Sequence, residues 1–94
     1  MALKGKQETK TIGGVDFTFQ HPGIEAVLDL RERAQDAKGN ISDKELSKEV
    51  FEHVVTAKVD DTVQKVDFEF FEEKFGGMKE YREVMKAAST FLFR

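Results

Sequence analysis

The residues that could carry chemistry are few and lie far apart along the chain. His21 and His53 are the only imidazoles, and no second histidine lies at a metal-ligand spacing such as i, i+4. A metal site needs at least three good ligands. The chain has no cysteine, which excludes a disulfide, a thiolate zinc site and a cysteine nucleophile. We therefore expect no bound metal and no cofactor.

The acidic residues form two groups that resemble cation sites only superficially. One group is Asp60-Asp61, and the other comprises Asp67, Glu69, Glu72 and Glu73. The calcium-binding loop requires acids at alternate positions, a glycine and a closing glutamate, and this pattern is missing. Acidic residues at the start of a helix are better explained by capping and by the helix dipole.

No serine stands in a nucleophile elbow or beside a base at a meaningful spacing. The serines are Ser42, Ser47 and Ser89. Neither glycine pair, Gly13-Gly14 or Gly76-Gly77, belongs to a lysine-containing phosphate loop. The sequence thus predicts a protein that is not an enzyme and that acts by binding.

Composition restricts the partners further. The 94 residues, of which 39% are apolar and 35% charged, fit a single domain spanning 1–94. The net charge is -3, and the acidic and basic residues are interspersed rather than grouped in blocks, so we expect no nucleic-acid partner. Charged residues interrupt every apolar run, so no membrane span is expected. The start carries Lys4, Lys6 and Lys10 without the apolar segment of a secretion signal, which favours the cytoplasm.

The first element that could position a binding surface is a β-hairpin over 9–20, after a flexible start at 1–8. Gly13-Gly14 supplies the positive φ angles of a tight turn. Val15, Phe17 and Phe19 then alternate with polar residues, as expected for a strand with one buried face.

Four helices are expected after the hairpin, at 22–38, 43–57, 68–75 and 78–93. Ser42 and Glu45 form a capping box at the start of the second, and Asp67 caps the third. The second helix is expected to carry an apolar stripe of Leu46, Val50, Val54 and Ala57, followed by a polar loop over 58–66. The predicted fold class is therefore mainly α, with an N-terminal β-hairpin packed on about four helices in a single small domain.

The chain has nine phenylalanines and no tryptophan, and two of these rings fall outside the expected helix stripes. Phe68, Phe71 and Phe75 share one helix face, whereas Phe70 lies roughly 130° from its centre, and Phe93 is similarly displaced on the last helix. Such rings either form an exposed partner surface or pack against the loop or hairpin. Our candidate partner-binding residues are Phe70, Phe93 and the neighbouring Phe91.

The order and spacing of these elements resemble the small tail assembly chaperones of long-tailed (siphovirus-type) phages and prophages of Gram-positive bacteria. The pattern extends over roughly residues 10–94, and Thr56-Ala57-Lys58 lacks the proline common in members at that point. The matching runs are Phe19-Gln20-His21-Pro22-Gly23, Glu52-His53-Val54-Val55, Asp67-Phe68 with Phe71, and Phe75-Gly76-Gly77 through Tyr81, Val84-Met85, Ala87-Ala88 and Phe91-Leu92-Phe93.

The resemblance implies a chaperone that binds and solubilises the phage tape measure protein, promotes tail tube assembly and then leaves. It also implies action in the host bacterial cytoplasm, absence from the mature virion, and a longer form made by ribosomal frameshifting. The tail tube protein and a second copy of the chain are further candidate partners. The alternative is a structural head-tail or tail-completion adaptor that stays in the virion. A small DNA-binding regulator is disfavoured by the acidic balance.

Overall fold

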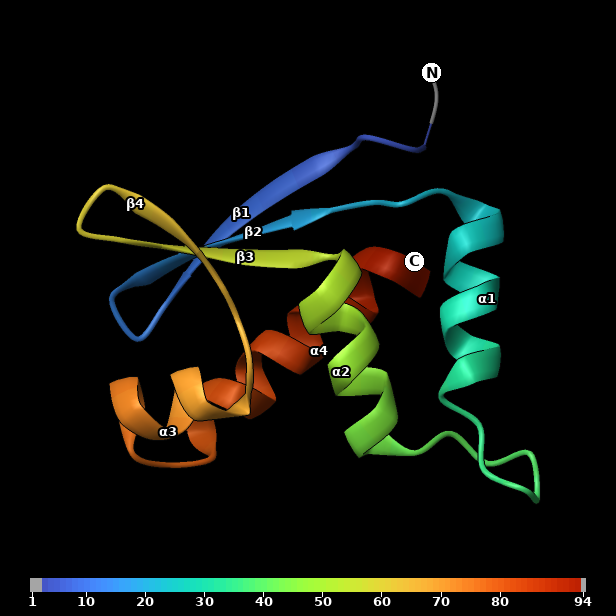
Figure 1. Ribbon diagram of the computed structural model, residues 1–94. Helices are drawn as coiled ribbons and strands as arrows, with labels where there is room; N and C mark the ends of the chain where they lie inside the picture. The colour runs from blue at the N-terminus through green and yellow to red at the C-terminus, as the bar shows by residue number, and fades with distance from the viewer. Residues whose placement is uncertain (1–2, 94) are drawn as a thin grey trace.

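A computed structural model describes residues 3–93, which form a four-stranded antiparallel sheet and four helices (Figure 1). The strands are β1 (Gln7–Ile12), β2 (Val15–Gln20), β3 (Val55–Val59) and β4 (Thr62–Lys65), and they pair in the order β1-β2-β3-β4. Helices α1 (Ile24–Arg33) and α2 (Asp43–His53) lie between β2 and β3 in the sequence. Helices α3 (Phe68–Phe75) and α4 (Lys79–Phe93) follow β4.

The sheet has one buried face and one polar face. On β2, Val15, Phe17 and Phe19 are buried and alternate with the less buried Asp16, Thr18 and Gln20. In the register, Phe17 is opposite Ala57 and Phe19 is opposite Val55, so the buried face continues into β3. The opposite face carries paired polar side chains, such as Thr9 and Thr18, whose Oγ1 atoms lie 3.1 Å apart. The sheet is therefore covered by helices on one side only.

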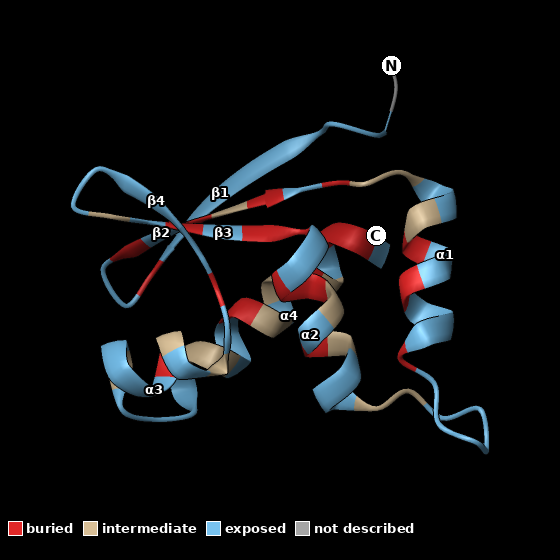
Figure 2. Ribbon diagram, in the orientation of Figure 1, coloured by how far each residue is buried: buried red, intermediate tan, exposed pale blue. Residues whose placement is uncertain are grey.

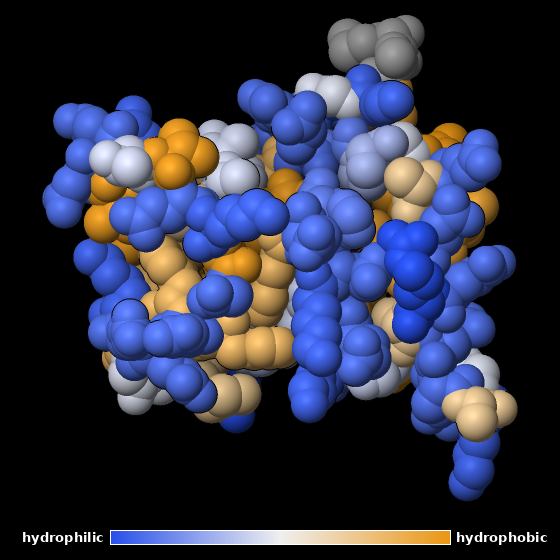
Figure 3. All heavy atoms as spheres, in the orientation of Figure 1, coloured by the Kyte–Doolittle hydropathy of each residue, from blue (hydrophilic) through white to orange (hydrophobic). Residues whose placement is uncertain are grey.

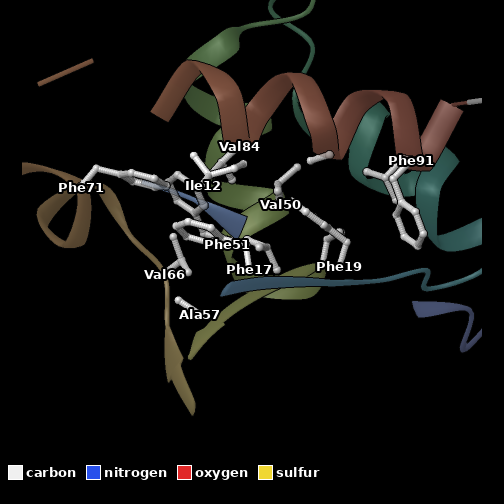
Figure 4. Close-up of a cluster of buried hydrophobic side chains, with 14 of the residues drawn as sticks. Ile12, Phe17, Phe19, Val50, Phe51, Ala57, Val66, Phe71, Val84 and Phe91 are labelled. Carbon is white, nitrogen blue, oxygen red and sulfur yellow. The ribbon is translucent and has the colours of Figure 1, made fainter. Parts of the chain in front are cut away.

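Helix α4 supplies most of that cover. Val84, Ala88, Phe91 and Leu92 are its buried residues, and their spacing places them on one helix face. In Figure 4, Val84 and Phe91 point from α4 toward the strands, with Phe17 and Phe19 below them. The resulting core also takes in Val50 and Phe51 of α2, and Figure 2 shows that the outer surfaces of α1, β1 and β4 remain largely exposed.

The expected fold class, mainly α with a single two-stranded hairpin, is wrong, because the molecule is an α+β domain with a four-stranded antiparallel sheet. The error lies in residues 54–66. The expected helix over 43–57 ends at His53, and Val55–Val59 form β3 instead. Val54 and Val55 are β-branched and favour a strand, and Val55, Thr56, Ala57 and Lys58 alternate between buried and exposed.

The expected polar loop over 58–66 is also wrong, since it contains the turn from β3 to β4 and β4 itself. Asp60 and Asp61 have φ angles of 51° and 64°, the positive values required at both central positions of a two-residue hairpin turn. Aspartate tolerates this left-handed conformation better than most residues. All four residues of β4 are exposed, so no apolar alternation marked it in the sequence.

Other boundaries differ less. The first helix covers Ile24–Arg33 rather than 22–38, because the chain then forms a local turn in which Oδ1 of Asp36 accepts hydrogen bonds from the amides of Lys38 and Asn40. Helix α3 has the expected bounds, α4 begins at Lys79 rather than at 78, and the hairpin over 9–20 lies within β1 and β2.

The expected flexible start, 1–8, falls partly outside the described residues, which begin at 3. Gln7 and Glu8 belong to β1. The amide of Gly5 donates to the carbonyl of His21 at 2.9 Å, and the amide of His21 donates to the carbonyl of Lys6 at 2.8 Å. The start of the described chain is thus held against the end of β2.

The hairpin turn at Asp60-Asp61 leads to the first testable prediction. Asp61→Gly should raise the free energy of unfolding by about 0.5 to 1 kcal/mol, because glycine occupies a positive φ without strain at a site that aspartate occupies at a cost. Chemical denaturation measures the change. A loss of stability would contradict the assignment of β3 and β4 as a hairpin.

The turn between β1 and β2 provides a second prediction with an internal control. Gly13 and Gly14 both have positive φ, but a Cβ on Gly13 would lie 2.6 Å from Cε1 of Phe75 on α3, whereas a Cβ on Gly14 would meet nothing within 4 Å. Both alanine variants should lose about 1 to 2 kcal/mol through backbone strain. Gly13→Ala should lose about 1 kcal/mol more through overpacking against Phe75. Equal losses in thermal melts would show that the turn does not press on α3.

Candidate functional site

Of the three candidate partner-binding residues, Phe70 is partly buried in the aromatic core. Its ring meets Phe17 edge-on with centroids 6.1 Å apart, and it lies 5.7 Å from Phe71 and 6.3 Å from Phe75. Part of the ring also lines a small hollow with Val59 of β3. On the face shown in Figure 3, apolar atoms are visible between the sheet and α3. Packing against the hairpin, the second alternative left open above, therefore describes most of this ring.

Phe91 is a core residue. It is buried on α4 and lies 6.1 Å from Phe19 and 5.7 Å from His21, measured between ring centroids. His21 is itself buried, and its Nδ1 accepts a hydrogen bond from the amide of Gly23 at 3.0 Å. This contact fixes the turn between β2 and α1, so Phe91 and His21 hold structure rather than offer a surface.

Phe93 is the exposed member of the three, with 45% of its surface accessible. The guanidinium carbon of Arg31 on α1 lies 5.9 Å from the centre of its ring, a cation–π arrangement at an exposed site. Arg31 is a flexible side chain, so the part of the ring that it covers can be exposed at low cost. Phe93 is therefore the candidate whose position suits contact with a partner.

Two further exposed apolar residues lie on α1 and were not among the predicted site residues. Ile24 is 65% and Leu28 is 53% exposed, whereas Val27, Leu30 and Ala34 are buried. In the sequence, these five apolar residues fall on one broad helix face. Ile24 and Leu28 are four residues apart and therefore lie together on one flank of the helix. A helical wheel centred on the three buried residues places both of them to one side of the buried face. Arg31, three residues beyond Leu28, continues this flank toward Phe93.

Two hollows, of about 250 and 270 Å³, lie beside α4 and share Leu46 of α2 as a lining residue. Together we call them the α4 groove. Residues from three helices and one loop line it: Asp43, Leu46, Ser47, Tyr81, Arg82, Met85, Lys86 and Ser89 in the first hollow, and Arg31, Ile41, Leu46 and Phe93 in the second. Apolar side chains, such as Leu46, Met85 and Phe93, and charged ones, such as Arg82 and Lys86, both line it.

A buried polar pair lies at the first hollow. The hydroxyl of Ser47 is 2.6 Å from that of Tyr81 and also donates to the carbonyl of Asp43 at 2.7 Å. The bond to a backbone carbonyl satisfies a serine that has no access to solvent. The partners of this hydroxyl are a backbone carbonyl and a tyrosine hydroxyl rather than a histidine or a carboxylate, so the pair joins α2 to α4 and is not an activated nucleophile.

The acidic residues act at helix starts. Oδ1 of Asp67 accepts from the amide of Phe70 at 2.7 Å, and the hydroxyl of Ser42 accepts from the amide of Glu45, so both predicted N-caps are confirmed. A side-chain hydrogen bond with Glu69, together with repulsion from that carboxylate, raises the pKa of Glu73 above its ordinary value. Within residues 3–93, no three His, Cys, Asp or Glu side chains are grouped so that they could hold a metal ion.

The three phenylalanines should respond differently to truncation. Phe91→Ala should lower the free energy of unfolding by about 3 to 5 kcal/mol, and Phe70→Ala by about 2 to 3 kcal/mol, because each leaves a void among packed rings. Phe93→Ala should change it less, by about 1 kcal/mol, because 45% of the residue's surface is already accessible. Thermal melts followed by circular dichroism compare the three. A large loss for Phe93→Ala would place that ring in the core.

Comparison with known proteins adds no relative: no family model, no curated protein and no solved structure matches the chain. None of the helices within residues 3–93 has both the length and the apolar character needed to cross a lipid bilayer.

Proposed function

We propose that this chain is a tail assembly chaperone that binds the tape measure protein of a siphovirus-type phage, keeps it soluble and promotes tail tube assembly. The observation that carries the proposal is that large apolar side chains of the helices are exposed, among them Phe93 on α4 and Ile24 and Leu28 on α1. Exposed apolar patches of this kind mark partner surfaces.

The residues behind the resemblance support the proposal through the fold they specify. His21 fixes the turn before α1, Val54 and Val55 join α2 to β3, Asp67 caps α3, and Phe91 lies in the core. These residues determine where α1 and α4 lie relative to each other. In a chaperone with this fold, the exposed side chains of α1 and α4 would therefore form the partner surface.

Binding centred on apolar side chains has consequences for its salt dependence. Raising the salt concentration should leave the complex with the tape measure protein largely intact, because screening weakens only charge interactions. A protein that bound nucleic acid would instead lose affinity steeply under the same change.

Co-expression tests the proposal. The soluble fraction of the cognate tape measure protein should rise several-fold with the wild-type chain, because bound copies cover apolar helix faces that otherwise aggregate. Phe93→Ser should reduce this gain. Val63→Ser serves as the matched control, since Val63 is 67% exposed but lies on the opposite side, in β4. The soluble fraction is measured by centrifugation and gel densitometry.

Two outcomes would contradict the proposal. One is an unchanged soluble fraction of the tape measure protein when the wild-type chain is present. The other is the finding, by mass spectrometry, of the chain at stoichiometric levels in purified virions, which would favour the head-tail or tail-completion adaptor instead.

A further inference from the structure

The α4 groove carries an excess of cationic residues. Three cationic residues line it, Arg31, Arg82 and Lys86, against one acidic residue, Asp43. The chain as a whole has the opposite balance, with 15 Lys and Arg against 18 Asp and Glu. The hollow between β1 and α4 is lined by Lys10 and Lys86 but also by Glu8 and Glu83, and the hollow at Phe68 is equally balanced. The α4 groove is thus more cationic than these two hollows, and its charge favours an acidic partner.

The shape of the groove favours a helix as its occupant. On α4 the lining runs from Tyr81 to Phe93, a span of about 18 Å, or just over three helical turns. Its walls are helices, whose backbone groups are bonded internally and cannot pair with an added strand. Recognition must therefore come from side chains, and Met85, Leu46 and Phe93 offer apolar contacts in succession along its length.

We propose that the α4 groove binds an amphipathic helix whose apolar stripe is flanked by carboxylates. The stripe would lie over Met85, Leu46 and Phe93, and the carboxylates would pair with Arg82 and Lys86 at one end and with Arg31 at the other. Arg31 now covers the ring of Phe93, so an acidic side chain that pairs with Arg31 would also uncover the ring. The inference rests on the proposed function in one respect: the helix would be a segment of the tape measure protein.

Model peptides test the groove independently of any natural partner. Two 16-residue helical peptides share the same leucine and alanine stripe and carry either glutamate or lysine at the flanking positions. Each is titrated into the ¹⁵N-labelled full chain and followed by NMR. The glutamate peptide should bind about ten-fold more tightly than the lysine peptide. The amide shifts should concentrate at residues 82–93 and at Leu46.

Charge reversal supplies the matched comparison. Arg82→Glu with Lys86→Glu should invert the preference between the two peptides. Lys58→Glu with Lys65→Glu makes an equal change of net charge on the sheet and should leave the preference unchanged. Leu46→Ser should weaken both peptides about ten-fold, and a melt of each variant checks that it folds.

Several results would overturn the inference. These are equal binding of both peptides, shifts located elsewhere, no shift at about millimolar peptide, or a dimer of the free chain, detected by ultracentrifugation, that Leu46→Ser dissociates. If Arg82→Glu with Lys86→Glu abolishes peptide selectivity but leaves the tape measure protein soluble on co-expression, the partner docks elsewhere and the proposed function stands. If the peptides bind as expected but the wild-type chain never solubilises that protein, the proposed function fails and the groove remains a helix site.

Discussion

The arrangement of the helices depends on the contacts of one aromatic ring, that of Phe71. It stacks on Phe17 of β2 with centroids 6.0 Å apart and planes 10° from parallel. It also meets Phe51 of α2 at 5.7 Å and Tyr81 of α4 at 5.8 Å. Phe71 is the one buried residue of α3, a helix of only eight residues. A helix so short has little stability of its own, so its position is set by this contact.

The consequences of that contact extend to the candidate site. Helix α3 leads directly into α4, and Tyr81 in the first turns of α4 touches both Phe71 and the buried hydroxyl of Ser47. These contacts hold the start of α4 against α2, while Phe91 and His21 hold its end against the sheet and α1. The α4 groove is formed between these two attachments, so the core fixes its width.

The parts of the fold that were predictable are those with local chemical signals. The hairpin of β1 and β2 has a glycine pair and strict alternation, and Ser42 and Asp67 cap α2 and α3 through bonds within one turn of helix. In strand β3 the local signals were ambiguous, and β4 has only one apolar residue, Val63. Ala57 fits a helix stripe with Val50 and Val54 as well as it fits a strand with Val55. Pairing with β2, which is distant in sequence, decides between helix and strand for this segment. The residue pattern of the segment alone does not show that such a pairing partner exists.

The candidate site was predictable to a lesser degree, and for a related reason. A helical wheel ranks side chains against one buried face, but Phe70 of α3 finds a second neighbour in Phe17, so its position off the stripe does not expose it. Phe93 is at the end of α4, beyond the sheet, and there the wheel and the structure agree. The cationic lining of the α4 groove brings together Arg31, Arg82 and Lys86 from two helices, and their spacing in sequence gives no sign of this.

The two sides of the domain carry different means of controlling association. The open face of the sheet presents threonines and charged residues, and its edge strands carry Lys10 and Lys65, features that discourage pairing between sheets. The helical side leaves Ile24, Leu28 and Phe93 exposed. An apolar surface on a small domain risks aggregation unless it is kept selective. If the α4 groove binds a helix as proposed, its cations would provide that selectivity at Phe93, because they would repel basic partners and favour an acidic one.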